Sequence, residues 1–318
     1  MDQRTGGSHG SIAALKDQLR LGLVGHENFI ERLLIAALSG GHMLVEGAPG
    51  LAKTRAAKWL SDAVEGSFAR IQCTPDLMPS DLTGTSVFRP QDGHFEFAPG
   101  PVFHNLVLVD EINRAPPKVQ SALLEAMAES QVTVGNETHA LPDPFLVVAT
   151  QNPIEHDGTF PLPEAQLDRF LLHVVLSLPD AETERKILDL VEAETQEGTP
   201  PHRTVTLDEL AEMRTAVRTV HLSPELRDYI VRLVMATRTG TYADEIEHAV
   251  SPRGSLALAA AAKARAYLHG RDYATPEDVA SLAVDALPHR MVLTWRSVAE
   301  GRTARALVAD VLEEVEPL

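Results

Sequence analysis

The sequence is short of three things: cysteine, long apolar runs and positive charge. Among its 318 residues Cys73 is the only cysteine, so no disulfide can form within the chain, and this favours a reducing cytoplasm. No apolar run approaches the ~20 residues of a membrane span, and the N-terminal residues 1–11 lack the apolar stretch of a signal peptide. We therefore expect a cytoplasmic protein without a membrane span.

Basic residues are scarce relative to acidic ones. Lysine and arginine number 28 against 45 acidic residues, which gives a net charge of −17. A chain of this charge binds nucleic acid or an anionic membrane poorly unless a local groove is basic. What remains is an ordinary globular balance, 44% hydrophobic and 23% charged, in a length that favours about two domains.

The first half of the chain alternates short apolar runs with helical patterns. The apolar runs predict five buried strands, at residues 42–47, 69–73, 105–110, 144–150 and 170–176. Helical spacing of apolar residues predicts helices over residues 51–64 and 117–129. Apolar runs of this length, separated by helices, favour a parallel sheet that is covered on both faces. The expected fold class is therefore α/β.

Two segments interrupt this alternation with hairpin patterns. Residues 86–100 hold Asp92-Gly93, and residues 131–141 hold Gly135-Asn136, each flanked by residues of period two. Such dipeptides are typical of two-residue hairpin turns. We expect two β-hairpins to project from the sheet.

The second half of the chain becomes helical after "EGTPP" at residues 197–201, which resembles a linker. Thr206 and Glu209 form a capping-box pattern, and the segment that follows has an apolar face at helical spacing. Thr275 precedes Pro276 in another helix-start pattern. These patterns predict a small all-α domain.

Residues 46–54, "EGAPGLAKT", nearly match the phosphate-binding pattern G-x-x-x-x-G-K-[ST] between a predicted strand and a predicted helix. Backbone N–H groups of such a loop wrap phosphates, Lys53 would reach the β/γ-phosphates, and Thr54 would bind Mg²⁺. Gly50 gives the loop freedom of φ. Ala52 stands where the pattern has glycine, which is tolerable if this position is helical and its methyl group points away from the phosphate. A turn without a ligand is the alternative.

Polar residues also follow two other predicted strands. Asp110 and Glu111 close one strand, where Asp110 is placed to hold Mg²⁺ through water and Glu111 to orient and deprotonate an attacking water. Asn152 follows another strand and could hold that water, although Asn-Pro is also a common turn. Arg169 and Arg253 are further candidates, each with the alternative of an ordinary surface arginine. Acids at a solvated strand end are the alternative for the first pair.

The phosphate loop, "VDE", "ATQNP", "QLDRF" and "SPRG", in this order and spacing, resemble an AAA+ ATPase. The stretches "EGAPGLAKT", "PSDLTG", "DEINRAPPKVQSALLEAMAE" and "PLPEAQLDRF" are specifically similar to the MoxR family, in which alanine before the lysine is usual. The resemblance covers all but the first 20 residues. It implies an N-terminal extension over 1–20, a parallel-sheet AAA+ core with the two inserted hairpins over 21–198, and a helical lid domain over 199–318.

The resemblance also implies roles for individual residues. Asp110 and Glu111 match Walker B, Asn152 matches sensor 1, Arg169 the arginine finger that serves a neighbouring subunit, and Arg253 sensor 2, acting within or between subunits. ATP is expected to contact the segment near the adenine and the Walker A loop through Gly25, His26, Gly47, Ala48, Pro49, Gly50, Leu51, Ala52, Lys53, Thr54 and Arg55. Mg²⁺ is expected on Thr54 and, through water, on Asp110.

The function implied by the resemblance is hydrolysis of ATP to ADP and phosphate in a homo-oligomeric ring, expected to be a hexamer. Such a ring acts as a chaperone that remodels, assembles or activates client proteins, often ones with von Willebrand factor A domains or a metal or cofactor requirement. Two alternatives stay open: a nucleotide-gated assembly scaffold with little turnover, and a DNA-translocating motor.

The hairpins and the polar set bear on these alternatives. Arg89 is the only lysine or arginine in residues 86–100 and residues 131–141 have none, whereas tracking of phosphates requires such residues. Phe95 and Phe97 suit contacts with peptide instead. A scaffold without turnover would not need Glu111, Asn152 and Arg169.

Other candidate sites are weaker. "EHD" at residues 155–157 lacks metal-ligand geometry, and the 13 histidines form no H-x-x-x-H pattern or Cys/His cluster. Cys73 has no evident base partner, so we expect a small buried hydrophobic residue.

Overall fold

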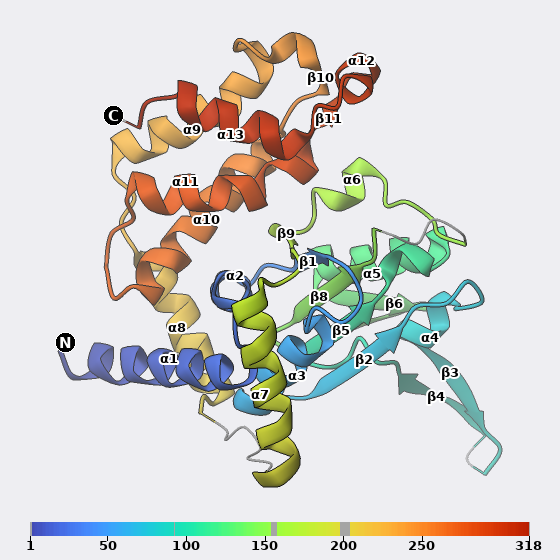
Figure 1. The fold of residues 1–318 in the computed structure, drawn as a ribbon. Helices are drawn as coiled ribbons and strands as arrows, with labels where there is room; N and C mark the ends of the chain where they lie inside the picture. Colours follow the sequence, from blue (N-terminus) through green and yellow to red (C-terminus); the bar gives the residue numbers. More distant parts are fainter. Residues whose placement is uncertain (1, 92, 154–157, 198–203, 318) are drawn as a thin grey trace.

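A parallel sheet of five strands forms the centre of the first domain in the computed structural model, which describes residues 2–91, 93–153, 158–197 and 204–317. The strand order is β2-β5-β8-β1-β9, and every neighbouring pair is parallel (Figure 1). The strands are β1 Met43–Glu46, β2 Phe68–Gln72, β5 Leu106–Asp110, β8 Leu146–Gln151 and β9 Leu172–Val175. All five predicted strands are confirmed.

Helices cover both faces of this sheet. Successive residues of a strand point to opposite faces, and here they pack in two different apolar clusters, each of which contains helices. Met43 and Val45 pack with α2 (Glu27–Ser39) and α3 (Lys53–Ala63). Leu44, between them, packs in a second cluster with α5 (Pro117–Glu129) and the short helix α4 (Pro79–Thr83). The two predicted helices are therefore present as α3 and α5, and the predicted coverage of both faces is confirmed.

Both predicted hairpins are present, as β3–β4 (Gly84–Arg89 and His94–Pro99) and β6–β7 (Gln131–Val134 and Glu137–Ala140). Figure 1 shows β3–β4 projecting from the body of the protein at the lower right. Phe97 of one hairpin stacks on His139 of the other, with ring centroids 3.9 Å apart and planes 11° apart. The two hairpins therefore form one unit beside the sheet.

The turn of the first hairpin differs from the prediction. Arg89 pairs with His94, so residues 90–93 connect the strands and the expected two-residue turn at Asp92-Gly93 is wrong. Pro90 has no N–H group to donate to the ladder, and pairing therefore ends one residue before it. Asp92 itself lies outside the described residues.

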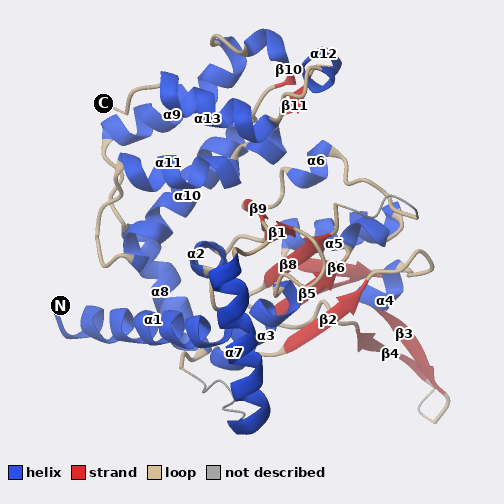
Figure 2. Cartoon of the chain, in the orientation of Figure 1, coloured by secondary structure: helices blue, strands red, loops and turns tan. Residues whose placement is uncertain are grey.

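The second half of the chain is mainly helical (Figure 2). Its helices are α8 Leu207–Thr219, α9 Pro224–Thr239, α10 Pro252–Leu268, α11 Pro276–Ala286, α12 Trp295–Ala299 and α13 Ala304–Glu314. The capping box at the start of α8 is confirmed, since Thr206 and Glu209 exchange backbone-to-side-chain hydrogen bonds. An antiparallel pair, β10 (Ile246–His248) and β11 (Val292–Leu293), makes the domain less purely α than expected.

Two further helices frame the first domain. Helix α1 (Asp2–Gly22) buries Ile12, Leu15 and Leu19 in the same apolar cluster as α2 and α3, so the boundary expected after residue 20 falls inside a helix. Helix α7 (Ala181–Glu197) leads to the predicted linker, of which residues 198–201 lie outside the described part. None of the described helices combines the length and the apolar character needed to cross a membrane.

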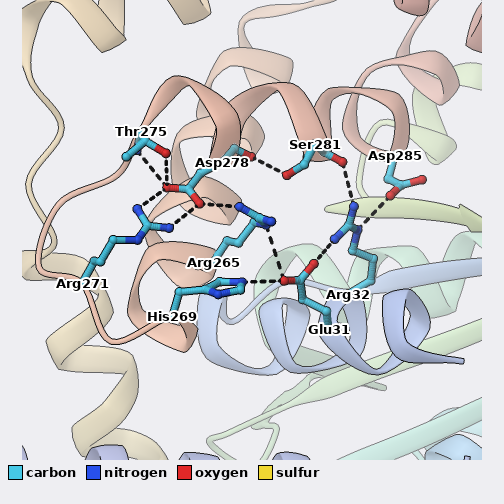
Figure 3. Close-up of polar contacts among 9 residues, drawn as sticks. All are labelled: Glu31, Arg32, Arg265, His269, Arg271, Thr275, Asp278, Ser281 and Asp285. Carbon is cyan, nitrogen blue, oxygen red and sulfur yellow. Dashed lines mark hydrogen bonds and ion pairs between the residues drawn. The ribbon is translucent and has the colours of Figure 1, made fainter.

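Charged side chains connect the two domains where α2 meets α10 and α11 (Figure 3). Arg32 donates from Nε to Asp285 Oδ2 at 2.9 Å and from Nη2 to the carbonyl oxygen of Ser281 at 2.7 Å. Beside it, Glu31 Oε1 lies 2.9 Å from His269 Nε2. We call Arg32 and Asp285, whose side chains are 8% and 10% exposed, the interdomain ion pair.

Candidate functional site

A cleft of about 690 Å³ opens at the carboxyl ends of β1, β5 and β8. This end of a parallel sheet is where α/β folds bind ligands, and the volume suits a small molecule. Among the predicted site residues, those that line it are His26, Pro49, Gly50, Leu51, Ala52, Lys53, Thr54, Arg55, Asp110, Glu111 and Asn152. The structure thus brings most of the predicted set together.

The loop between β1 and α3 places a lysine at the cleft. Lys53, the first residue of α3, donates from Nζ to the carbonyl oxygen of Gly47 at 2.6 Å and to that of Gln151 at 3.4 Å. Burial lowers the pKa of Lys53, while the nearby carboxylates, led by Asp110, oppose this shift. Gly47 and Ala48 belong to the loop but are not among the described residues that line the cleft.

Ala52 does not have the helical conformation on which its tolerance was argued. It lies just before α3, at φ 54° and ψ 14°, in the left-handed region. Its side chain packs against the apolar cluster of α2 and α3. Glycine would adopt this φ freely, whereas alanine pays roughly 1–2 kcal/mol in steric energy. The structure accommodates the residue by packing its methyl group.

Asp110 ends β5 and is surrounded by donors. Thr150 Oγ1 donates to its Oδ1 at 3.2 Å, Arg70 Nε donates to its Oδ2 at 2.6 Å, and Thr54 Oγ1 lies 3.5 Å from both oxygens. A hydroxyl oxygen and a carboxylate beside a phosphate-type loop are the hard donors that Mg²⁺ takes together with phosphate oxygens. The hydroxyl oxygen of Thr54 and the carboxylate oxygens of Asp110 are therefore suitable ligands for Mg²⁺.

Glu111 and Asn152 lie at the same cleft. Glu111 has a φ of 57°, and its backbone N–H donates to Thr150 Oγ1 at 3.0 Å. Its carboxylate oxygen Oε2 accepts from Gln72 Nε2 at 3.0 Å and from Arg114 Nη1 at 3.2 Å. Asn152 follows β8 and is buried, with 5% of its surface exposed. A carboxylate and an amide thus line the same cleft as the Asp110 side chain.

The segment "LVGHE" contributes Leu23, Val24 and His26 to the cleft. Burial lowers the pKa of His26. Gly25 is absent from the lining among the described residues, and a Cβ atom there would lie 2.1 Å from Thr183 Cγ2. Gly25 therefore permits close packing of α7, and this positions its two neighbours at the cleft.

An apolar wall of the cleft was not predicted. It comes from α7 and the loop before it and consists of Leu178, Pro179, Ile187, Leu190 and Val191. Sequence reasoning missed it because these residues follow the recognised motifs and resemble an ordinary amphipathic helix. A wall of this kind suits the flat faces of a nucleotide base.

The two predicted arginines, Arg169 and Arg253, are not among the described residues that line this cleft. Arg169 is exposed and donates from Nη1 to the carbonyl oxygen of Leu124 at 2.8 Å. Arg253 is the second residue of α10, and its Nη1 lies 3.4 Å from Oδ2 of Asp168, the neighbour of Arg169 in the chain. Asp168 thereby brings both arginines to one surface where the two domains meet.

Sequence reasoning also missed several polar residues around the acids. Arg70 and Gln72 are two residues apart on β2, so their side chains point to the same side of the strand and reach Asp110 and Glu111. Their alternation within "ARIQC" was the available signal. Thr150, two residues before Asn152, is a further polar residue beside the acids that the sequence analysis did not single out.

The weaker candidates that fall on described residues give no second site. Cys73 is buried with 1% exposure, and burial raises the pKa of its thiol to about 12, so the predicted role as a small hydrophobic residue is confirmed. Among the described residues no group of three or more histidine, cysteine, aspartate or glutamate side chains could hold a metal ion. The "EHD" segment lies outside the described residues.

Fold and cleft together define a class, a phosphate-loop α/β protein with a helical lid. The family model described as "ATPase family associated with various cellular activities (AAA)" matches residues 42–172, and the model described as "AAA lid domain" matches residues 238–311. A solved structure of a candidate ATPase from Cytophaga hutchinsonii superposes with a TM-score of 0.90 at 40% identity, over 99% of this chain and 97% of that one.

Two proteins of similar sequence identify the family within this class. The uncharacterised protein YeaC of Bacillus subtilis is 43% identical over 92% of this chain and 91% of its own length. Chaperone MoxR1 of Mycobacterium tuberculosis is 42% identical over 92% of this chain and 78% of its own length. The chain belongs to the MoxR family of AAA+ ATPases.

Proposed function

We propose that this protein hydrolyses ATP in a ring of identical subunits and uses the reaction to remodel client proteins. The observation that carries the proposal is the meeting of Lys53, Thr54, Asp110, Glu111 and Asn152 in one cleft. These residues come from the loop after β1 and from the ends of β5 and β8. Phosphoryl transfer requires such positioning and charge stabilisation rather than covalent participation of the protein.

Each residue has a defined task in this proposal. The loop N–H groups and Lys53 hold the phosphates. Thr54 and Asp110 would hold Mg²⁺, which would neutralise the negative charge that develops on the phosphate oxygens. Glu111 accepts a proton from the water that attacks the γ-phosphorus, and Asn152 orients that water. Val24, His26 and the apolar wall of α7 hold the base.

The two arginines complete a neighbour's site rather than their own. Arg169 and Arg253 flank Asp168 on a surface away from the cleft of their own subunit. We therefore assign Arg169 as the finger that enters the next subunit's cleft, and Arg253 acts in the same direction. An arginine supplied in this way contributes roughly 10³–10⁵ in rate, so ring assembly, expected to be hexameric, controls activity.

The client-binding part is the β3–β4 hairpin. Its side chains Val87, Phe88 and Phe95 are 42%, 50% and 70% exposed, which suits contact with an unfolded or flexible peptide. Arg89 is ion-paired with Glu96 on the same hairpin, so this element offers little for DNA phosphates. A relative named as a chaperone supports this role, and clients with von Willebrand factor A domains in the cytoplasm stay our expectation.

The proposal predicts distinct defects for two variants. Lys53→Ala removes the charge that holds the phosphates and should abolish nucleotide binding. Glu111→Gln removes the proton acceptor but keeps the shape, so ATP should bind while hydrolysis falls by a factor of about 10² or more. Binding of a fluorescent ATP analogue and release of phosphate measure the two steps separately, with Glu129→Gln, on the exposed end of α5, as control.

The unaltered protein should show an ATPase rate per subunit that rises steeply with protein concentration, because the sites form between subunits. Binding without turnover at every concentration, with or without client, would instead favour a nucleotide-gated scaffold. Hydrolysis by Glu111→Gln at the unaltered rate would contradict the assigned chemistry.

A further inference from the structure

Arg70 is a cationic residue of the cleft that the assigned chemistry does not use. It lies on β2, and its Nε donates to Asp110 Oδ2 at 2.6 Å. Its Nη2 also donates to Gln72 Oε1 at 3.4 Å. The Arg70 side chain is 52% exposed, whereas that of Asp110 is 8% exposed. A half-exposed cation is therefore held on the most buried acid of the site.

This pairing involves the carboxylate that would hold Mg²⁺. Oδ1 of Asp110 accepts from Thr150, and Thr54 lies 3.5 Å from both oxygens, while Arg70 occupies Oδ2. A metal ion held by Asp110, directly or through water, must share this carboxylate with the guanidinium. Two cations on one carboxylate repel each other, so each lowers the affinity of the other for the site.

The same guanidinium attracts nucleotide phosphates. Arg70, Lys53 and Thr54 line one cleft, so a phosphate group there interacts with both side-chain cations. Positive charge from Arg70 therefore takes over part of the stabilisation of the phosphates that Mg²⁺ would otherwise provide. The two cations should therefore act antagonistically on nucleotide affinity, and such coupling is reciprocal by thermodynamic necessity.

We propose that Arg70 is a positioning residue that acts through Asp110 and weakens the dependence of nucleotide binding on Mg²⁺. The inference rests on the proposed function, because it requires that the cleft binds nucleotide. The consequence of this role of Arg70 for the ATPase cycle is that Mg²⁺ is released more easily. When Mg²⁺ leaves with the product, the guanidinium keeps Asp110 paired and spares the protein an uncompensated buried charge.

The test is the ratio of two dissociation constants for a fluorescent ADP analogue, one in excess EDTA and one in saturating Mg²⁺. In Arg70→Gln this ratio should rise at least about fivefold over that of the unaltered protein. Arg70→Met, which keeps the aliphatic stem, should give the same increase. Arg70→Lys, which keeps the charge, should lie closer to the unaltered ratio.

The control is Arg296→Gln, which removes the same charge from an exposed position of α12 and should leave the ratio unchanged. Arg70 is half exposed, so its replacement leaves no cavity, and thermal unfolding checks that each variant is folded. A ratio that stays constant or falls in both Arg70→Gln and Arg70→Met overturns the inference while leaving the proposed function intact. Failure of the unaltered protein to bind the analogue overturns both.

Discussion

At the scale of single residues, the backbone of the site is strained at two positions. Ala52 and Glu111 have φ values of 54° and 57°, and each such residue costs roughly 1–2 kcal/mol relative to an ordinary conformation. Ser130, the remaining described non-glycine residue of this kind, lies after the last residue of α5, where a left-handed conformation is common. The two described left-handed non-glycine residues that precede a helix rather than follow one therefore both lie beside the catalytic chemistry that we propose.

The residue types of the site could be predicted from the sequence, but their conformations could not. The pattern around Lys53 indicated a phosphate loop, but it did not show that Ala52 has a left-handed backbone and packs against an apolar cluster drawn from many parts of the chain. Arg70 and Gln72 were missed for a related reason. Their role follows from β2 lying next to β5, and a local sequence pattern does not show which strands are neighbours in the sheet.

His42 gives the protein a defined dependence of stability on pH. It is buried, with Nε2 3.1 Å from the carbonyl oxygen of Met127 and Nδ1 accepting from the Val147 N–H at 3.0 Å. Both contacts are satisfied by the neutral ring with its proton on Nε2. Burial lowers the pKa of His42 to about 4 from the ordinary 6.5.

Because the pKa of His42 is lower in the folded state, the unfolded chain binds more protons between pH 6.5 and 4. The stabilisation is complete above pH 6.5 and is lost as the pH falls, by about 2 kcal/mol at pH 5. Urea unfolding at pH 7 and pH 5 should show a loss that is smaller by this amount in His42→Asn. His94→Asn, at an exposed position of β4, should behave like the unaltered protein; equal losses in all three would contradict the prediction.

At the scale of elements, the interdomain ion pair holds α2 against α11 (Figure 3). Arg32→Ala leaves Asp285 buried with only Arg305 as a described cationic partner, at 3.0 Å. Breaking a buried pair from one side should lower the free energy of unfolding by about 3 kcal/mol. Arg20→Ala is the matched control, since Arg20 is 45% exposed and pairs with Glu27 on the surface.

The control should cost less than about 1 kcal/mol in urea unfolding, because exposed pairs contribute little. Equal effects of Arg32→Ala and Arg20→Ala would show that the interdomain ion pair does not hold the domains together. A drop in Arg32→Ala alone would show that the interdomain ion pair on α2 helps to join the sheet domain and the helical domain.

Elements with a recognised apolar or turn pattern were predicted, whereas the shortest strands and the long helices α1 and α7 were not. The predicted helix over residues 117–129 coincides with α5, because apolar spacing and proline at its start agree. The strands β10 and β11 have three and two residues, too few for any periodicity to show. The turn of β3–β4 was misplaced because the Asp-Gly pattern competed with Pro90, and the missing N–H group of proline decided where pairing ends.

At the scale of the whole molecule, the chain holds a phosphate loop, an acidic pair and an amide in its cleft, whereas Arg169 and Arg253 are not among the described residues that line it. The sequence predicted all these residues in their order along the chain. The cleft residues meet because β5, β8 and β1 are neighbours in the sheet, whereas Arg169 and Arg253 lie beside Asp168, which contacts Ser251 and Arg253. This separation is what makes the central claim, active sites shared between subunits, testable.

The most direct test mixes two inactive variants, Lys53→Ala and Arg169→Ala, and measures ATP hydrolysis. In a mixed ring an Arg169→Ala subunit keeps an intact cleft and can receive the arginine of a Lys53→Ala neighbour. Random mixing in equal amounts should restore about a quarter of the unaltered rate, since one interface in about four combines the intact parts. A mixture of Lys53→Ala with Glu111→Gln, whose defects lie in the same cleft, should stay inactive. A Lys53→Ala and Arg169→Ala mixture that is as inactive as its parents at every ratio would contradict the shared site.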